Sequence, residues 1–355
     1  LYVRLGRGRR RRAFRRLVDF AHVIFGMSQV TQIDVGADED GIRLDRWFKR
    51  RFPALTHGRL EKLLRTGQVR VDGARAKASA RLAAGQTVRV PPLGEDAEKP
   101  APKIERDLSD KDAAYVRSLV IHKDKSLLVL NKPAGLAVQG GTKTERHLDG
   151  MLDALQFEAK ERPRLVHRLD RDTSGVLVLA RTARAAAALG RAFQQKDARK
   201  IYWALVIGTP TPLQGTIDLA LAKQGGPRAE RVSPAAAGDE DAQHAVTHYS
   251  VVTSVSTKFS WVAFMPLTGR THQIRAHARA IEAPIVGDGK YGGITAHPGG
   301  EIPRQLHLHA RSIDIAHPDG GRFFIEAELP PHMKKSWKLL GLEERDAEGA
   351  FDGLE

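Results

Sequence analysis

The chain has 355 residues, a formal net charge of +15 and 41% hydrophobic residues, so it can bury a sizeable core and its charge favours a polyanionic partner. It contains no cysteine, which excludes disulfides, thiol nucleophiles and cysteine-based zinc sites. No run of about 18 apolar residues occurs, so no membrane-spanning helix is expected.

Residues 1–30 are predicted to be a basic leader outside the folded domains. The first 26 residues hold eight arginines and one acidic residue, Asp19. Asp19 and His22 interrupt the apolar stretch and no small-residue cleavage site follows, so a secretory signal peptide is not expected. We expect translation to start at Met27, with the leader a gene-model artefact or a disordered extension. The alternatives are an organelle presequence and an RNA-binding tail.

Residues 31–91 are predicted to form a small α/β unit. Leu44, Trp47 and Phe48 recur at the spacing of one helix face. Thr56 is a predicted N-cap for a second helix that ends at Gly67. The segment QVRVDG then alternates as a strand into an Asp-Gly turn, and a further alternating strand covers residues 87–90.

This unit carries a basic polar side. The pattern LDRWF…R…GQVRVDG resembles the S-four-like RNA-binding domain, named after a ribosomal protein, in which the second helix and the following turn lie against RNA. The resemblance assigns substrate RNA binding to Arg59, Lys62, Arg65 and Arg70. The alternative is a solvated basic face on a small helical domain.

Residues 92–114 are rich in proline and charge and are predicted to be a flexible linker. A single domain is expected over residues 115–340, followed by a tail over 341–355. Its helices are few and lie between many strands, which favours an α+β fold with a largely antiparallel sheet over a repeated βαβ fold.

The elements of this domain follow from local patterns. Residues 176–180 form an apolar run typical of a strand buried on both faces, and Thr182 can cap a helix that reaches about Gln195. A helix is also expected to start at a Thr271 cap. Two further strands are predicted around a polar turn within residues 119–133, and the other predicted strands lie within residues 201–207, 248–255, 261–267, 306–318 and 322–329.

The segment LVHRLDRDTSGVLVLA, residues 165–180, places Asp170 between Arg168 and Arg171. Neighbouring guanidinium groups favour an ionised carboxylate, which suits a single nucleophile, although an aspartate between arginines is also typical of a structural ion pair. Asp172 opens a further alternative, because glycoside hydrolysis uses two carboxyls several ångströms apart.

Tyr202 lies on a predicted strand in which Ile201, Trp203 and Leu205 occupy one face. Tyr202 shares the other face with Ala204, and this small residue leaves room beside the ring. An exposed ring of this kind can stack on an extruded base, whereas a strand tyrosine elsewhere is usually a core residue.

Three segments resemble, in the expected order, the signatures of the RluA-type RNA pseudouridine synthases. They are HRLDRDTSG at 167–175, KIYWALVIG at 200–208 and GRTHQIR at 269–275. The loops at 131–141 and 286–293 also resemble family loops. The combination with an S-four-like domain is most similar to the group C enzymes that act on large-subunit ribosomal RNA, and the sister group D, which has the same layout, is the alternative.

The resemblance implies a pseudouridine synthase fold with a central cleft and assigns the site residues. Asp170 is the catalytic aspartate, Tyr202 stacks on the uracil or also acts as a base, and Arg275 pairs with Asp170. Arg168 fills the space that the extruded base leaves, and extrusion costs a few kcal/mol. His167 and Arg270 are assigned with Arg168 to substrate binding, and Arg270 and His272 are expected to support their loop or to contact RNA phosphate.

The implied reaction isomerises uridine to pseudouridine in RNA, with large-subunit ribosomal RNA as the expected partner. It conserves atoms and redox state, so no cofactor is expected. His307 and His309 have no carboxylate or thiol at ligand spacing, so no metal is expected either. A cytoplasmic monomer without membrane contact is predicted. The alternatives are a catalytically inactive ribosomal RNA-binding or assembly factor and a hydrolase that releases uracil.

Overall fold

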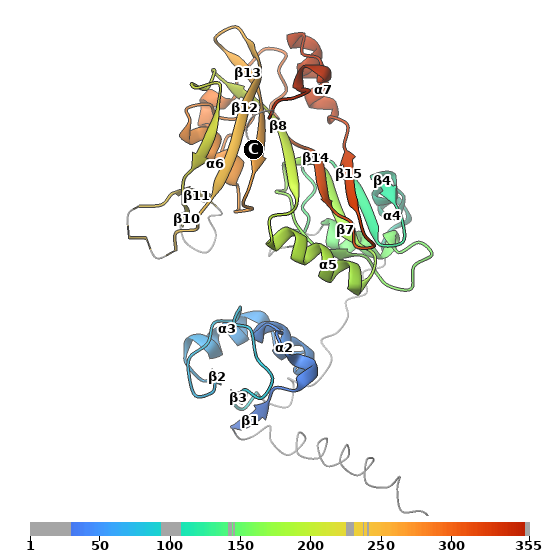
Figure 1. The fold of residues 1–355 in the computed structure, drawn as a ribbon, viewed down its shortest axis with the longest axis vertical. Coiled ribbons are helices and arrows are strands. Elements are labelled where there is room, and N and C mark those ends of the chain that lie inside the picture. Colours follow the sequence, from blue (N-terminus) through green and yellow to red (C-terminus); the bar gives the residue numbers. More distant parts are fainter. Residues whose placement is uncertain are drawn as a thin grey trace, which may run out of the picture. The chain divides into compact units, whose positions relative to one another are not determined.

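The computed structural model divides the chain into two compact units, Leu1–Arg106 and Asp107–Glu355 (Figure 1). The predictions for residues 1–29 of the leader and for residues 94–107 of the linker fall outside the described residues. The structure describes residues 30–93, 108–140, 144, 146–224, 231–236, 238–239 and 241–351.

The N-terminal unit packs two helices on a small antiparallel sheet. Leu44, Trp47 and Phe48 are fully buried in its core, which confirms the predicted helix face. The sheet has the order β1-β3-β2. The elements are β1 (Thr31–Asp34), η1 (Ala37–Glu39), α2 (Leu44–Arg51), α3 (His57–Arg65), β2 (Arg70–Val71) and β3 (Thr87–Val90).

The predicted caps and turns of this unit are also present. The Thr56 hydroxyl accepts a hydrogen bond from the Arg59 backbone N–H, and Gly67 follows α3 with a φ of +70°. Asp72 and Gly73 both have positive φ, which suits the tight turn after β2. The edge strand β1 was not predicted, because its four residues alternate between exposed and half-buried positions without an apolar run.

The second unit is built on a ten-stranded sheet of order β4-β5-β7-β14-β8-β13-β12-β9, with β15 paired to β14 and β6 to β7. Of the strand pairs that the structure describes, β7 with β14 is parallel and the others are antiparallel. The predicted α+β class is therefore confirmed. The strands are β4 (Val120–Lys123), β5 (Leu127–Lys132), β6 (Arg164–Leu165), β7 (Ser174–Ala180), β8 (Arg199–Ile207), β9 (Gln214–Asp218), β10 (Leu221–Gln224), β11 (Arg231–Pro234), β12 (Val246–Val255), β13 (Phe259–Pro266), β14 (Leu308–Ala316) and β15 (Arg322–Glu326).

Helices cover both faces of this sheet, so its central strands are buried on both sides (Figure 1). Alternate residues of β7 pack against α5 on one face and against η3 and α4 on the other. Likewise, β8 packs against α6 on one face and α7 on the other. The helices are α4 (Asp110–Ser118), η3 (Leu148–Leu155), α5 (Ala183–Gln194), α6 (Gln273–Ala280), η4 (Gly293–Ala296), α7 (Pro331–Leu340) and η5 (Glu344–Ala347).

Three predicted boundaries are corrected by the structure. Helix α4 begins at Asp110, inside the segment predicted as linker, because the Ser109 side chain caps it despite its charged composition. Helix α6 begins after His272, not at a Thr271 cap. In the predicted tail, Leu342 and Phe351 are buried in the core that contains α7, so residues 341–351 belong to the folded unit.

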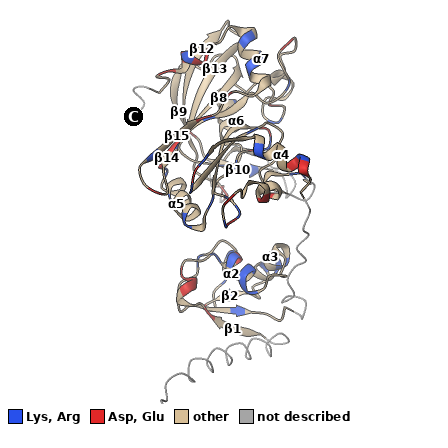
Figure 2. Cartoon of the chain, turned by 90° about the vertical axis from the view of Figure 1, so that its right-hand side faces the viewer, with Lys and Arg blue, Asp and Glu red and all other residues tan. Residues whose placement is uncertain are grey.

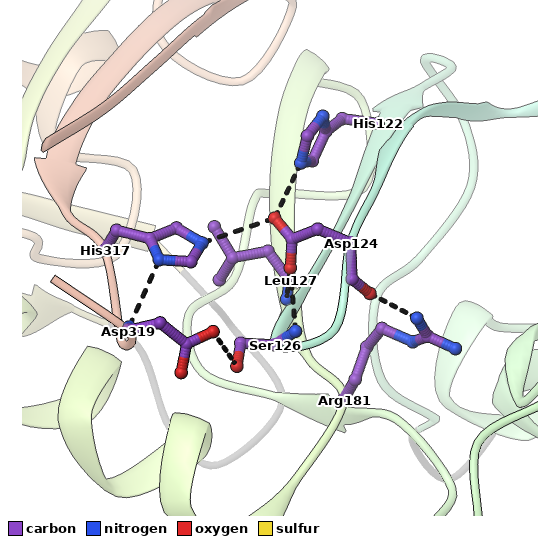
Figure 3. Close-up of polar contacts among 7 residues, drawn as sticks. All are labelled: His122, Asp124, Ser126, Leu127, Arg181, His317 and Asp319. Carbon is purple, nitrogen blue, oxygen red and sulfur yellow. Dashed lines mark hydrogen bonds and ion pairs between the residues drawn. The ribbon is translucent and has the colours of Figure 1, made fainter. Parts of the chain in front are cut away.

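A partly buried network joins the turn between β4 and β5 to the turn between β14 and β15 (Figure 3). The Asp124 carboxylate lies 2.8 Å from His122 and 3.3 Å from His317, and it accepts two backbone N–H groups of its own turn. Ser126 donates to Asp319 across the same junction. Burial opposes ionisation of Asp124, but these hydrogen bonds outweigh it and lower its pKa to about 2. The junction is therefore held by a charged carboxylate.

Candidate active site

Asp170, Tyr202 and Arg275 line one cavity of about 450 Å³ between the β6–β7 loop, β8 and α6. A second cavity, of about 940 Å³, extends from the same loop toward residues 133–140 and 287–290. Asp170 lines both cavities, so it stands where they meet. The sequence had placed these three side chains in one site, and the structure brings them to one cavity.

The loop that carries Asp170 is tied to the loop that follows β5. Lys132 is fully buried, and its ammonium group donates to the carbonyls of Pro133, Leu136 and Arg171 at 2.9–3.0 Å. Burial lowers the pKa of Lys132 to about 7, although Asp172 and Asp170 oppose this shift. The lysine was not singled out from the sequence, and it fixes the backbone one residue after Asp170.

Beyond Asp170 the chain enters β7 through a close backbone crossing. Gly175 has a φ of +111°, and a Cβ added there would lie 2.2 Å from the Ala310 carbonyl oxygen on β14. Ser174 lies 2.9 Å from the ring of His309 on the same strand. The Ser-Gly pair therefore lets β7 and β14 approach, which sets the position of the loop that carries Asp170.

The pKa of Asp170 is raised, because burial opposes the charged form more strongly than Arg275, Arg168 and the nearby lysines favour it. Its side chain is only 21% exposed. The sequence predicted that the neighbouring arginines would favour the ionised form of Asp170, whereas in the structure burial has the larger effect on its pKa. A poorly solvated carboxylate is a stronger base and nucleophile than one in water, and carboxyl groups at active sites often have a raised pKa.

Arg275 does not form the expected ion pair with Asp170. Its guanidinium donates two hydrogen bonds to Asp288, at 2.8 and 2.7 Å, and lies 5.1 Å from the ring centre of Tyr291. Asp288 was missed because it lies in a glycine-rich loop whose pattern indicated only tight turns. Arg275 thus acts on Asp170 through its field, from a position that Asp288 sets.

His272 lies beside Asp170, with its Nε2 3.8 Å from the carboxylate oxygen. The other ring nitrogen of His272 lies 3.0 Å from the phenol oxygen of Tyr291. The sequence assigned His272 to loop support or phosphate contact. A lone histidine before a helix gave no signal for its position beside Asp170.

Tyr202 and Ala204 pack together on one face of β8, and Ile201, Trp203 and Leu205 pack on the other, as predicted. Burial, with the negative charge of Asp170 as the second cause, raises the pKa of Tyr202. The phenol is therefore neutral near pH 7. A neutral ring suits stacking on a base but cannot act as a general base.

The predicted substrate-binding residues of this unit differ in their contacts. His167 lines the smaller cavity, accepts the Val178 backbone N–H and stacks on Phe193, and burial lowers its pKa to about 3. Arg270 donates to the His244 carbonyl. Arg168 is exposed and lines both cavities, so it is placed to meet a ligand.

The predicted RNA-binding residues of the N-terminal unit also divide into two kinds. Arg59 donates to the Leu93 carbonyl, and Arg70 donates to backbone carbonyls of the turns around β2. Lys62 and Arg65 lie in the last turn of α3. Arg59 and Arg70 therefore brace this unit.

The remaining candidate ligands serve the fold. His307 contacts the Ser336 hydroxyl at 2.8 Å, and His309 lies between Ser174 and the Ala327 carbonyl. Across the described ranges no group of three or more His, Asp or Glu side chains has a geometry that could hold a metal ion. The same part of the chain has no helix long and apolar enough to cross a bilayer.

Comparison with known proteins points to one class. The family model described as RNA pseudouridylate synthase matches residues 126–280. RNA pseudouridine synthase 4, mitochondrial, of Arabidopsis thaliana is 35% identical over 83% of this chain and 78% of its own length. Ribosomal large subunit pseudouridine synthase C of Rickettsia prowazekii is 34% identical over 81% of this chain and 94% of its own.

A solved structure agrees with this class. Human RNA Pseudouridylate Synthase Domain Containing 4 is 28% identical, with a TM-score of 0.56 over 66% of this chain and 98% of that one. The fold and the relatives define an RNA-modifying isomerase. The chain belongs to the RluA-type RNA pseudouridine synthases, which isomerise uridine to pseudouridine within RNA.

Proposed function

We propose that this enzyme modifies uridines of large-subunit ribosomal RNA, with Asp170 as its catalytic residue. The position of Asp170 where two cavities meet carries the proposal, because one cavity can hold the extruded base while the other holds the attached backbone. The name of the Rickettsia relative, which covers most of both chains, supports this choice of RNA.

The reaction begins with extrusion of the uridine, whose base enters the smaller cavity and stacks on the neutral ring of Tyr202. Arg168 occupies the vacated space in the RNA. Asp170 then either attacks C1′ or removes a C2′ proton, and the N1–C1′ bond breaks. The detached uracil turns and C5 bonds to C1′. In the first route this step displaces the Asp170 carboxylate from C1′, and in the second Asp170 returns the proton to C2′. The C5 proton then leaves and N1 gains one. Positioning of the uracil by the cavity walls is as important as the carboxylate.

The N-terminal unit is proposed to be the S-four-like domain that holds the RNA. Lys and Arg residues of this unit are marked in blue in Figure 2. Lys62 and Arg65, at the exposed end of α3, are the proposed phosphate contacts. Arg59 and Arg70 use part of their donors on backbone carbonyls and keep the rest for RNA. Cytoplasmic location and the monomeric state stay predictions.

The test of this proposal is the variant Asp170→Asn. We expect it to bind RNA normally and to lose at least about a thousandfold in rate, about 4 kcal/mol, which exceeds the roughly 1–3 kcal/mol of one stacking contact. Tritium release from ribosomal RNA that carries 5-tritiated uridine measures the rate. Asp172→Asn is the control, because this exposed carboxylate has no role in the proposed reaction.

Three outcomes separate the proposal from its rivals. Normal turnover by Asp170→Asn would remove the assigned role. Free uracil among the products would favour a hydrolase, and RNA binding without isomerisation by the wild-type chain would favour an assembly factor. Primer extension after carbodiimide treatment maps the modified uridines and tests the choice of large-subunit RNA.

A further inference from the structure

His272 has an unusual backbone for a residue at the start of a helix. It precedes α6 with φ +52° and ψ +22°, in the left-handed region, and its side chain makes no cap to the helix. Few residues other than glycine adopt positive φ, although histidine does so more often than most. Such strain is frequent at functional sites. The conformation is thus not explained by capping of α6.

The ring of His272 is instead directed into the active site. Its side chain is 7% exposed, and its Nε2 lies 3.8 Å from the Asp170 carboxylate. Its Nδ1 lies 3.0 Å from the Tyr291 hydroxyl, and the two rings meet edge to face at 5.7 Å. His272 therefore bridges the catalytic loop and the loop that follows α6.

The donors and acceptors of this bridge are assigned from the contacts of Tyr291. The Tyr291 oxygen accepts the backbone N–H of Val232 on β11, at 3.1 Å. Burial, as the main cause, raises the pKa of Tyr291, so its hydroxyl keeps a proton to donate. We assign the tautomer of His272 in which Nδ1 accepts from the Tyr291 hydroxyl and Nε2 carries the hydrogen, because Nε2 then faces Asp170 with an N–H, the favourable partner for a carboxylate.

The support of Tyr291 extends to two further elements. Tyr291 packs with Val232 of β11 and Ala276 of α6 in one buried cluster. Its backbone N–H donates to Asp288, which also holds Arg275. The phenol of Tyr291 is thus fixed by contacts with β11, with α6 and with its own loop. Its hydroxyl therefore holds the His272 ring in one orientation.

We propose that His272 is a positioning residue for Asp170, held by the Tyr291 hydroxyl so that its Nε2–H orients the reacting carboxylate. The separation of 3.8 Å exceeds a hydrogen bond, and catalytic contacts of this kind tighten when substrate binds. The inference rests on the proposed function, in which Asp170 reacts. It differs from contact with an RNA phosphate, for which a side chain that is only 7% exposed is poorly placed.

The test compares two amides at position 272. Glutamine places its amide nitrogen near the position of Nε2, whereas asparagine places it near Nδ1 and cannot reach Asp170. Asparagine also adopts positive φ more readily than glutamine, so a purely structural role predicts that His272→Asn is the better variant. The proposed role predicts the opposite order in activity.

Single-turnover tritium release from in vitro transcribed large-subunit ribosomal RNA, with enzyme in excess, gives the rate, and filter binding gives the Kd. We expect His272→Asn to slow the reaction by about tenfold to a hundredfold, the range for a hydrogen bond to a charged group. His272→Gln should recover most of the rate, and Tyr291→Phe should fall between them. The RNA Kd should stay within about threefold throughout. His244→Gln, an exposed histidine of the same unit, is the control.

Three results would overturn the inference. They are a wild-type rate in His272→Asn, an equal loss in both amide variants, and a weaker Kd with an unchanged rate. Thermal unfolding of each variant separates a lost fold from a lost rate, and Tyr291→Phe tests the same bridge without changing position 272. A wild-type chain that releases no tritium would instead overturn the proposed function together with this role.

Discussion

Asp288 is a fully buried carboxylate that accepts four hydrogen bonds. Two come from the guanidinium of Arg275, and two come from the backbone N–H groups of Lys290 and Tyr291. The residue touches neither cavity as a lining residue, yet it sets the place of Arg275 and of the phenol that holds His272. Asp288 therefore supports the site through its contacts with Arg275 and Tyr291, without lining either cavity.

Replacement of Asp288 by asparagine should unfold the protein more easily and slow catalysis. The amide oxygen can still accept the two backbone N–H groups, but the charge that balances Arg275 is lost, and breaking a buried ion pair costs about 3–5 kcal/mol. Thermal or urea unfolding measures the loss, and tritium release measures the rate.

The matched control is Asp314→Asn. Asp314 forms an ion pair of similar length, 2.8 Å, with Arg322, but both side chains are over a third exposed, so the cost should be about 0–1 kcal/mol. Equal destabilisation by the two variants would contradict the role given to Asp288.

At this scale the sequence predicted the side chains that face the cavity better than those that support them. Asp170 and Tyr202 were placed correctly because each lies in a distinctive local pattern. The predicted partner of Arg275 was wrong, because the sequence does not show which of two nearby aspartates the guanidinium of a residue on a helix will contact. Burial of Asp170 was likewise set by packing from distant elements.

Among the elements, the junction of β7 with β14 leaves no room for a side chain at Gly175. Gly175 pairs with Ala310 there, in the parallel contact of the sheet, with backbone groups too close for any side chain. Because Asp170 lies five residues before this contact, the junction links the sheet to the catalytic loop.

Gly175→Ala should therefore destabilise the protein by several kcal/mol, since the added methyl group meets a backbone carbonyl and the residue has positive φ. Gly190→Ala is the matched control: Gly190 lies within α5 with open space around it, and alanine there should stabilise by up to about 1 kcal/mol. Urea unfolding measures both. A Gly175→Ala variant as stable as the wild type would show that β7 and β14 can separate without cost.

Element prediction succeeded where caps and apolar periodicity agree, as for α5, in which the Thr182 side chain accepts the Ala185 N–H. It failed where composition was the guide. Residues 110–114 of helix α4 were predicted as linker because they are mostly polar, and the helix depends on the Ser109 cap and on packing of Val116. The short strands β9, β10 and β11 were missed because they lack an apolar run.

At the scale of the molecule, each compact unit has its own buried core. The two sets of candidate residues lie in different units. The residues that line the cavities lie in the second unit, and the residues proposed to hold the RNA lie in the first. The sequence predicted two domains because composition changes sharply after residue 91. It could not predict where the second domain begins, since Ser109 and α4 continue the same polar composition.

This division predicts that binding and chemistry respond to different substitutions. In the full chain, Lys62→Gln with Arg65→Gln should weaken RNA binding and reduce the slope of log Kd against log salt by about 1.4–1.8, the value for two lost phosphate contacts. The single-turnover rate at saturating enzyme should not change, because neither residue lines the cavities at Asp170. Filter binding across a salt series gives the slope.

The control for this variant removes the same charge from the first helix of the unit, as Arg46→Gln with Lys49→Gln. Both control residues are exposed on α2, so general charge attraction is reduced equally while the end of α3 stays intact. If RNA lies against α3, the α3 variant should lose more of the slope than the α2 variant. Equal losses would mean that the unit attracts RNA by net charge alone, and a slower rate at saturation would place the end of α3 in the chemical step.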